Sequence, residues 1–433
     1  MRVKLKTLGC RLNEAELESW ARQLETLGHC IVTEAEASDL VVFNSCAVTV
    51  DAARKSRHLL RREQRENPAA RVVLSGCYAT LEPDEALSLG VDLIIANADK
   101  HRLVDWVQEH FDLRPEYPPA LHHAESALFK LGRQRAFIKV QDGCRYRCTY
   151  CIVTVARGEE RSRPIAEIVD EVNTVQAEGL SEIVLTGVHL GGYGSESGHR
   201  LDHLIDALLQ HTAIPRIRLG SLEPWDIPET LISQFAHPRL MPHLHLPLQS
   251  GSDTVLKRMA RRCRTDEFTR LTEHLRATVP DINITTDLIV GFPGETEAEW
   301  QQTLNYVEQI GFGHIHVFAY SPRAGTHAAQ LPDRVPEPIK NERSRTLRAL
   351  AEQQAHTYRS RFLGRVFPVL WEKSRTRPDG STENHGLTPN YLRATLAYTG
   401  NADRVNQISS ARLHTLADES ESSHFKAVPV ETP

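Results

Sequence analysis

Three cysteines stand close together in the stretch DGCRYRCTYC, where Cys144, Cys148 and Cys151 follow the spacing CxxxCxxC. Thiolates bind both zinc and iron–sulfur clusters. A closed zinc site uses four protein ligands, whereas three thiolates can hold three corners of a cubane cluster and leave one iron open. The spacing therefore favours a 4Fe–4S cluster whose open iron is left for a substrate or cofactor. A zinc site completed by a distant histidine and a redox pair of Cys148 and Cys151 are the alternatives.

A second set of cysteines follows apolar runs of strand length: Cys10 ends KTLGC, Cys46 ends VVFNSC and Cys77 ends VVLSGC. In an open parallel α/β sheet, the carboxyl ends of the strands line one crevice. We therefore expect these three thiols to meet and to bind a second cluster with an accessible iron. The alternative is that all three are small core residues. Cys30 and Cys263 are expected to be ordinary packing residues or exposed bystanders.

The elements that must position these cysteines follow from the hydrophobic pattern. Over residues 1–112, runs such as DLVVFNS and RVVLSG alternate with helical patterns and predict a parallel-sheet α/β domain. Over residues 132–362, six strand-like runs alternate with helical stretches and predict an incomplete (β/α)6 barrel, with the first cysteine set after its first strand. Residues 363–417 predict a small β-barrel. Residues 113–131 are interpreted as a linker and 418–433 as a polar tail.

Composition narrows the setting of this chemistry. The chain has no apolar run near the roughly 18 to 20 residues of a membrane span, so we expect no membrane association. The first residues, MRVKLKTLGC, lack the apolar core of a signal peptide, which predicts a cytoplasmic protein with reduced thiols. The net charge of −5 neither supports nor excludes nucleic acid, although positive charge clusters locally between Ala53 and Arg65.

The CxxxCxxC stretch resembles the radical S-adenosylmethionine superfamily, in which this spacing holds a 4Fe–4S cluster. Tyr150 is similar to the superfamily's adenine contact, and DLIVGFPGE to its adenine-contacting strand and turn, although Asp287 stands where many members have glycine. A plain strand ending in a proline–glycine turn is the alternative for that segment. The candidate S-adenosylmethionine contacts are Tyr150, Gly187, Glu223, Gln249, Ile289 and Gly291. Of these, Glu223 and Gln249 could equally cap a following helix or turn.

Over nearly the whole chain, the order of segments resembles the radical methylthiotransferases. TLGCRLNEAELE and the ARG after the cluster loop are most similar to the branch that acts on threonylcarbamoyladenosine in tRNA. The loop HLGGYG departs from the family's usual asparagine-initiated form at His189, and VNQISSARLHTLA matches weakly.

This resemblance implies an enzyme that adds a methylthio group to C2 of N6-threonylcarbamoyladenosine at position 37 of the tRNA anticodon loop. It implies that Cys144, Cys148 and Cys151 hold the cluster that cleaves S-adenosylmethionine. Cys10, Cys46 and Cys77 would then hold an auxiliary 4Fe–4S cluster that carries the sulfur, and the last domain resembles an RNA-binding TRAM module. An electron donor such as a flavodoxin or ferredoxin and a sulfur donor are implied partners. We expect both triads to line a single pocket.

Candidate RNA contacts lie in two basic groups, although a solvated charged face is the alternative for each residue. They are Arg54, Arg57, Arg61 and Arg62, then Lys373, Arg375 and Arg377. Three rival functions stay open. The first is a sibling enzyme that modifies isopentenyladenosine in tRNA or a ribosomal protein. The others are a non-catalytic iron–sulfur RNA-binding protein and a zinc-dependent RNA-binding protein.

Overall fold

The computed structural model describes the chain apart from residues 34–35, 112–131, 133, 399–402, 417–423 and 431–433. The predicted linker, residues 113–131, therefore lies outside the described residues. Contacts between residues divide the chain into two units. The first comprises Met1–Arg163, Thr186–His189 and Ser321–Ala329, and the second comprises Pro164–Leu185, Leu190–Tyr320 and Gln330–Pro433. By its contacts, the loop with the first cysteine set belongs with the N-terminal sheet.

The first unit contains the predicted parallel sheet, and its strand order is β2-β1-β3-β4-β5. Every neighbouring pair in this sheet is parallel, which confirms the prediction. The strands are β1 (Arg2–Thr7), β2 (Cys30–Val32), β3 (Leu40–Ser45), β4 (Arg71–Gly76) and β5 (Leu93–Ile95). The helices are α1 (Arg11–Thr26), α2 (Val50–Glu66), α3 (Cys77–Leu81), α4 (Pro83–Ser88), η1 (Lys100–Arg102) and α5 (Leu103–Phe111).

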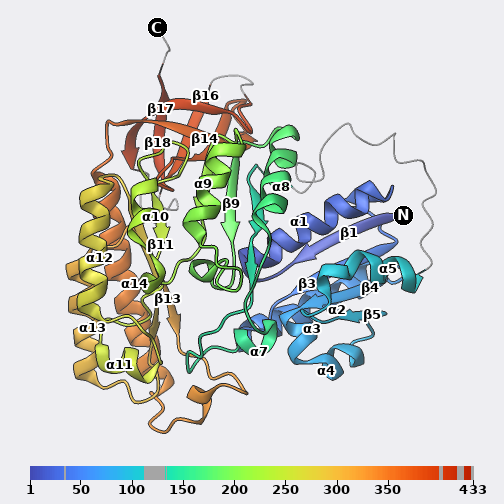
Figure 1. Ribbon diagram of the computed structural model, residues 1–433, viewed down its shortest axis with the longest axis horizontal. Coiled ribbons are helices and arrows are strands. Elements are labelled where there is room, and N and C mark those ends of the chain that lie inside the picture. Colours follow the sequence, from blue (N-terminus) through green and yellow to red (C-terminus); the bar gives the residue numbers. More distant parts are fainter. Residues whose placement is uncertain (34–35, 112–131, 133, 399–402, 417–423, 431–433) are drawn as a thin grey trace. The chain divides into compact units, whose positions relative to one another are not determined.

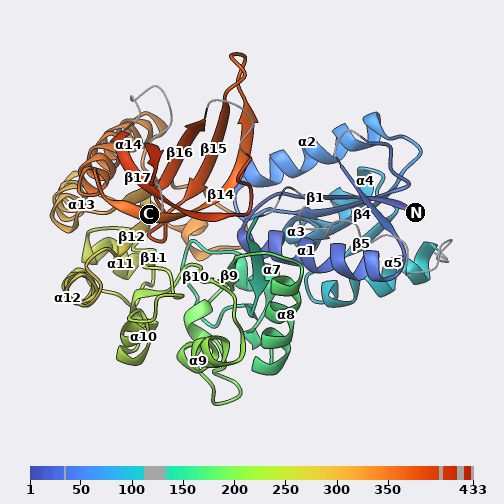
Figure 2. The same ribbon diagram turned by 90° about the horizontal axis from the view of Figure 1, so that it is seen from above.

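Both faces of this sheet are covered, because its strands are apolar on both sides. Val42 packs in one core cluster with residues of α1 and α5, whereas its neighbour Phe43 packs in another with residues of α2 and α3. Figure 2 shows α1 and α5 on one side of the sheet and α2 on the other. Parallel sheets buried on both faces expose function at the strand ends, and the second cysteine set lies at those ends.

The predicted strands of the central segment are all present, and helices separate most of them. The segment begins in the first unit with β6 (Ala136–Lys139), β7 (Gln141–Asp142), α7 (Val153–Arg157) and β8 (Arg161–Ser162). Its later strands are β9 (Glu182–Thr186), β10 (Arg216–Leu219), β11 (His243–His245), β12 (Asn283–Val290) and β13 (His314–Ala319). The later helices are α8 (Ile165–Ala177), η3 (Leu190–Gly192), α9 (Leu201–His211), η4 (Pro224–Asp226), α10 (Glu229–Gln234), α11 (Asp253–Arg258), α12 (Thr265–Thr278), α13 (Glu297–Ile310), η5 (His327–Gln330) and α14 (Glu337–Ser360). Strands β11, β12 and β13 form one parallel sheet.

The C-terminal strands close into a barrel in the order β14-β15-β16-β18-β17, which confirms the predicted small β-barrel. Its strands are β14 (Val366–Thr376), β15 (Thr382–Leu387), β16 (Arg393–Tyr398), β17 (Ile408–Leu416) and β18 (Phe425–Pro429). The fully buried Trp371 and Phe425 lie in its core.

The interpretation of residues 418–433 as a polar tail is wrong for β18. This strand pairs with β16 and β17 and completes the barrel. Phe425 and Ala427 are buried and Lys426 is exposed, so a short period-two pattern buries two apolar side chains within a polar stretch. Closure removes the open edges of the sheet, a gain that depends on the partner strands and is invisible in the segment itself.

Among the described residues, no helix combines the length and the apolar character needed to cross a membrane.

Candidate functional site

The first cysteine set lies in the loop between β7 and α7, and all three thiols are half-buried. The Cys151 N–H donates to the Cys148 carbonyl at 3.0 Å, which folds the loop back on itself. Burial, and to a smaller extent the neighbouring Cys151 and Cys148, raise the pKa of the Cys144 thiol to about 12. The three sulfurs therefore lie close enough for each charge to act on the others.

This donor set fits an iron–sulfur cluster. The Tyr146 N–H points at the Cys144 sulfur and the Val153 N–H at the Cys151 sulfur, each at 3.4 Å. Backbone N–H groups aimed at sulfur stabilise bound thiolates and tune the metal. The raised pKa keeps the Cys144 thiol neutral near pH 7 without a metal, mainly because burial disfavours its thiolate. A bound metal group supplies the positive charge that holds all three as thiolates.

A glycine makes this loop possible. Gly143, directly before Cys144, has a φ of +74°, and a Cβ built on it would lie 1.9 Å from the Glu159 carbonyl oxygen. The Cys144 N–H also donates to the Gly158 carbonyl at 3.2 Å, so the two sides of the loop touch through backbone alone. The position of the first thiol therefore depends on the absence of a side chain at 143.

The members of the second cysteine set lie at the carboxyl ends of the three neighbouring strands β1, β3 and β4. Cys10 precedes α1, Cys46 follows β3, and Cys77 begins α3 after β4. Burial, and to a smaller extent the nearby Cys77 and Cys10, raise the pKa of Cys46 to about 11. A Cβ on Gly9 would lie 3.2 Å from the Cys46 sulfur, so the end of β1 passes directly against that thiol. Cys10 is exposed, whereas the other two thiols are buried.

Arg157, the last residue of α7, connects the surroundings of the two cysteine sets. Its buried guanidinium donates to Asn13 Oδ1 at 2.6 Å, Glu16 Oε1 at 3.1 Å and Asp142 Oδ1 at 3.0 Å. Burial opposes the charge, but Glu16, Asp142 and the nearby Cys77 and Cys10 hold the pKa of Arg157 well above its ordinary value. The cationic side chain that follows the first cysteine loop thus faces the thiols of the second set.

Two lysines complete this buried ionic network. Lys100 Nζ lies 2.5 Å from Glu16 Oε2, and Lys139 Nζ lies 2.9 Å from Glu16 Oε1 and 2.6 Å from Asp142 Oδ2. Burial, and then the charge of Arg157, lower the pKa of Lys100 to about 8. A buried charge is tolerated only with such partners. The sequence analysis quoted Glu16, Asp142 and Arg157 only as parts of motifs and did not predict that they form a network.

An asparagine adds a neutral connection between the two sets. Asn97 Nδ2 donates to the Ala156 carbonyl at 2.7 Å and lies 3.6 Å from the Cys77 sulfur. Ala156 belongs to α7, just after the first cysteine loop. The two triads are therefore parts of one hydrogen-bonded unit. Their opening onto a single pocket stays a prediction.

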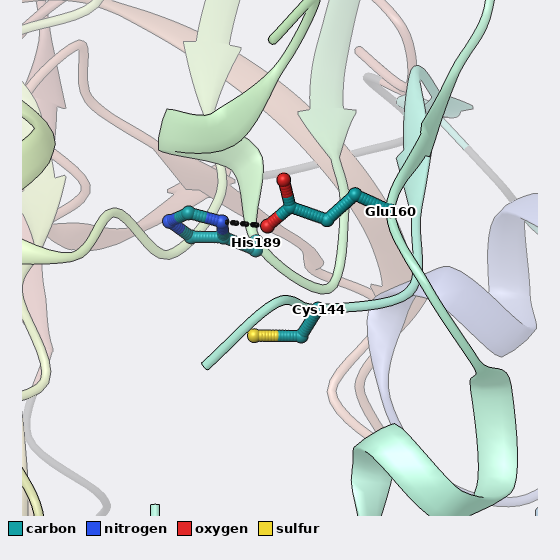
Figure 3. A group of neighbouring side chains, drawn as sticks. All are labelled: Cys144, Glu160 and His189. Carbon is teal, nitrogen blue, oxygen red and sulfur yellow. Dashed lines mark hydrogen bonds and ion pairs between the residues drawn. The ribbon is translucent and has the colours of Figure 1, made fainter. Parts of the chain in front are cut away.

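A histidine and a glutamate stand beside the first triad. Figure 3 shows His189 and Glu160 next to Cys144, and the His189 Nδ1 and Glu160 Oε1 atoms are 2.5 Å apart. The ligand atoms of these three residues all lie within 4.8 Å of one another. Glu160 also accepts the Arg145 N–H at 3.1 Å, and so holds the cluster loop. His189 is the position at which the loop HLGGYG departs from the family pattern, and that departure was the available signal.

The candidate S-adenosylmethionine contacts fall in both units. Tyr150 is half-buried in the cluster loop, and a Cβ on Gly187 would lie 2.9 Å from Gln141 Oε1. In the second unit, the Gln249 N–H donates to the Asp287 carbonyl, and the Gln249 carbonyl accepts the Ile289 N–H, each at 2.9 Å. Gln249 therefore extends the sheet beside β12 with a φ of +79°.

The remaining two candidates have partners within the second unit. Glu223 accepts from Arg261 at 2.6 Å. The Gly291 N–H donates to Glu295 at 2.7 Å, and a Cβ on Gly291 would lie 2.2 Å from Lys340 Cγ. Glycine at 291 is thus required by the fold itself, and its role toward a cofactor stays a prediction.

The N-terminal basic group lies along α2, and several of its charges are offset. Arg54 pairs with Asp51, Arg57 with Glu85 and Arg62 with Glu66, and Arg61 is exposed. Each pair leaves the arginine able to reach an anion, because surface ion pairs contribute little and exchange easily.

In the C-terminal barrel, Lys373 and Arg375 are exposed at alternate positions of β14, so they share one face of the strand. Arg377 is exposed beyond the end of β14 and pairs with Glu383.

Comparison with known proteins identifies families and relatives that are similar to this chain. The model of the radical SAM superfamily matches residues 138–307, and that of the uncharacterized protein family UPF0004 matches residues 2–96. The chain is 37% identical over 425 residues to a threonylcarbamoyladenosine tRNA methylthiotransferase, MtaB, of Thermotoga maritima, covering 96% of this chain and 95% of that one. It is 33% identical over 442 residues to a tRNA-2-methylthio-N(6)-dimethylallyladenosine synthase of Maricaulis maris, covering 97% and 96%.

A solved structure shares the fold. The radical S-adenosylmethionine methyltransferase TsrM of Kitasatospora setae, with cobalamin and a [4Fe-4S] cluster bound, matches with a TM-score of 0.51 and 14% identity. The match covers 76% of this chain and 77% of that one. At this identity the likeness concerns the fold alone.

Proposed function

The chain belongs to the radical S-adenosylmethionine methylthiotransferases, and we propose that it adds a methylthio group to C2 of N6-threonylcarbamoyladenosine at position 37 of tRNA. One observation supports this most directly. The relative that carries the corresponding name aligns over 96% of this chain and 95% of its own length, so the likeness is not confined to the central segment. A match confined to the central segment would support radical chemistry without a substrate.

The residues of the first triad fit the cluster that this chemistry needs. Cys144, Cys148 and Cys151 would hold a 4Fe–4S cluster whose open iron binds S-adenosylmethionine. When bound, these groups supply the radical chemistry that substitution at C2 of an adenine requires, because that carbon is a poor target for simple thiolate attack. Tyr150, Gly187, Glu223, Gln249, Ile289 and Gly291 are the proposed contacts of S-adenosylmethionine.

The residues of the second triad support a second cluster. Cys10, Cys46 and Cys77 gather three thiols with no fourth cysteine beside them among the described residues, so one position of a bound cluster would remain open to a sulfur-containing group. Radical generation at the first cluster and sulfur supply at the second require a fixed distance between the two sites. The buried network around Arg157 provides that constraint, because its acceptors come from α1 and from the first cysteine loop.

The substrate base must come from single-stranded RNA, the form in which a base can be turned toward a protein site. The exposed Arg61 of α2 and the exposed Lys373 and Arg375 of β14 are proposed phosphate contacts. We further propose a low-potential donor such as a flavodoxin or ferredoxin, and a sulfur donor that renews the auxiliary group.

The test is mass spectrometry of nucleosides from total tRNA of a strain that lacks the gene. The strain is complemented with the intact protein, with a Cys10→Ala, Cys46→Ala, Cys77→Ala variant, or with Cys30→Ala as the control. Cys30 is exposed and begins β2, at the end of the sheet opposite the strand ends that carry the triad. The methylthio adduct of threonylcarbamoyladenosine should return with the intact protein and with Cys30→Ala, and not with the triple variant.

A second candidate is the dimethylallyladenosine branch, because a relative of that name aligns over 97% of this chain at 33% identity. The same nucleoside digest separates the two. A methylthio adduct that returns on isopentenyladenosine, with threonylcarbamoyladenosine unchanged, would place the chain in that branch.

A further inference from the structure

Three neighbouring strands bring a group of polar side chains to one face of the sheet β11-β12-β13. His245 is in register with Thr285, and Thr285 with His314. One row further along, Asp287 is in register with His316. Residues in register on adjacent parallel strands point to the same side, and every second residue of one strand does too. All five side chains therefore share one face.

This is the open face of the sheet. On β12, the alternate residues Thr286 and Leu288 are fully buried, whereas Asp287 and Ile289 are only half-buried. On β13, His316 is exposed. The face that carries the histidines is thus the more exposed of the two along this part of the sheet.

Two of these side chains are held in place by hydrogen bonds. His245 Nε2 lies 3.2 Å from Asp287 Oδ1, and His245 Nδ1 lies 2.9 Å from Thr285 Oγ1. A carboxylate only accepts hydrogen bonds, so the Nε2–H of His245 donates to Asp287. Both ring nitrogens of His245 therefore have hydrogen-bond partners, which fix the position of the imidazole. The bond from Nε2 stabilises the negative charge of Asp287.

His316 stands next to this pair. Its ring centroid lies 5.7 Å from that of His245 and 4.5 Å from that of His314. The ligand atoms of His245, Asp287 and His316 all lie within 4.8 Å of one another. One small group can therefore contact an imidazole N–H and a carboxylate at once.

The next row of the same face is apolar. Ile289 is in register with Phe318, whose side chain is 49% exposed although it is large and hydrophobic. Ile289 is a proposed contact of S-adenosylmethionine, so this apolar row borders the proposed cofactor site. The polar row of Asp287 and His316 lies directly beside it on the same face.

Resting on the proposed function, we propose that His245, Asp287 and His316 bind the threonylcarbamoyl group of the target adenosine and so select this nucleoside. The carbamoyl linkage offers N–H donors, which a carboxylate such as that of Asp287 accepts. The threonine carboxylate accepts hydrogen bonds, which an imidazole N–H such as that of His316 donates. A dimethylallyl group has neither, so it would displace water from Asp287 and His316 without supplying hydrogen bonds in its place.

The same three residue types can also bind a divalent cation. Ligand atoms around one tetrahedral zinc ion lie only about 3.4 Å apart, which follows from metal–ligand distances of about 2.05 Å. In the present set His245 and Asp287 already use their facing atoms on each other, in an internal hydrogen bond of 3.2 Å. The geometry thus favours a larger organic group, and a metal is the competing outcome of the test.

The experiment measures the affinity of the anaerobically reconstituted enzyme for labelled anticodon stem–loop RNA. The RNA carries either threonylcarbamoyladenosine or plain adenosine at the target position. The variants are His316→Ala, His316→Gln, which keeps a donor, and the control His274→Ala. His274 is an exposed histidine of α12 that pairs with Glu229 outside this face.

The intact enzyme should bind the modified RNA about tenfold more tightly than the plain RNA, as expected for hydrogen bonds to a charged group. His316→Ala should abolish that preference, His316→Gln should retain part of it, and His274→Ala should retain all of it, at unchanged unfolding temperatures. An unchanged preference in His316→Ala overturns the inference. The inference is also overturned if the intact enzyme binds one equivalent of added zinc and His316→Ala loses that binding.

Turnover separates this result from the proposed function. If the intact enzyme methylthiolates the modified RNA while His316→Ala keeps the preference, only the inference fails. If the intact enzyme leaves the modified RNA unchanged and acts on isopentenyladenosine, the proposed function fails.

Discussion

The two cysteine triads reach similar arrangements by different routes. Cys144, Cys148 and Cys151 lie in one loop, and local backbone hydrogen bonds bring their sulfurs together. The second triad is collected from three strands that are distant in the sequence, and only the order of the sheet makes its members neighbours. The first arrangement is therefore a property of a short peptide, whereas the second exists only in the folded domain.

A shared feature qualifies this contrast. Each triad depends on a glycine with positive φ that lies directly before one of its cysteines, Gly143 before Cys144 and Gly76 before Cys77. Each also depends on the buried network around Arg157. The local triad is thus less independent of the fold than its spacing indicates, and the following changes test how far the two differ.

The largest effect should come from removing one triad at a time. Replacing Cys144, Cys148 and Cys151 by alanine should reduce both cleavage of S-adenosylmethionine and formation of product to background. Replacing Cys10, Cys46 and Cys77 should leave cleavage within about twofold and abolish the product, while iron falls from about eight to about four atoms per chain. Iron analysis and chromatography of the cleavage products measure both. Loss of cleavage in the second variant would contradict a division between the sites.

The next effect concerns the network that joins the triads. Arg157→Met should destabilise the metal-free protein by about 3–5 kcal/mol, because it leaves Glu16 and Asp142 buried with an excess of negative charge. Urea unfolding measures this change. Arg147→Met is the control. Arg147 is exposed in the first cysteine loop, and its pair with Glu159 contributes at most about 1 kcal/mol. Equal effects of the two substitutions would show that the network does not hold the fold.

Smaller effects should distinguish alanine substitutions at Gly76 and Gly143 from an alanine substitution at Gly158. A Cβ on Gly76 would lie 2.3 Å from the Ser45 carbonyl oxygen, and one on Gly143 would lie 1.9 Å from that of Glu159. Gly158 also has a positive φ, but a Cβ there meets nothing within 4 Å.

Gly76→Ala should therefore lower iron binding at the second triad, and Gly143→Ala at the first. Gly158→Ala should lower only stability, by about 1–2 kcal/mol. Anaerobic reconstitution followed by iron analysis distinguishes them. Full iron loading of Gly76→Ala and Gly143→Ala would mean that the backbone can shift with little cost in free energy.

The smallest effect is a pH dependence of the metal-free protein. Burial raises the pKa of Cys46 to about 11, above the value of about 8.5 expected in the unfolded chain. Above pH 8.5 the unfolded chain loses this proton first, so the contribution of Cys46 is complete below that pH and is lost as the pH approaches 11. Between pH 8 and 11 the thermal unfolding temperature should fall more steeply for the intact protein than for Cys46→Ala. Parallel curves would contradict a buried, neutral thiol at this position.

The fold was largely predictable because its signals are local and periodic. Apolar runs ending in Cys10, Cys46 and Cys77 identify parallel strands, and the strand ends of such a sheet meet by topology alone. The barrel strand β18 was missed, because Phe425 and Ala427 carry too little apolar signal without the strands that they pair with. The polar face of β11, β12 and β13 was also invisible, since its members are brought together by strand register.

What the sequence by itself determined is the set of chemical groups and their order: two cysteine triads, an α/β frame and a closing β-barrel. Spacing within a loop and period within a strand are enough for that, because both follow from backbone geometry over a few residues. What only the tertiary structure decided is which charges are buried together. Glu16, Asp142 and Arg157 look like ordinary polar residues in the sequence, and only the packing of α1 and α7 removes them from water and makes each depend on the others.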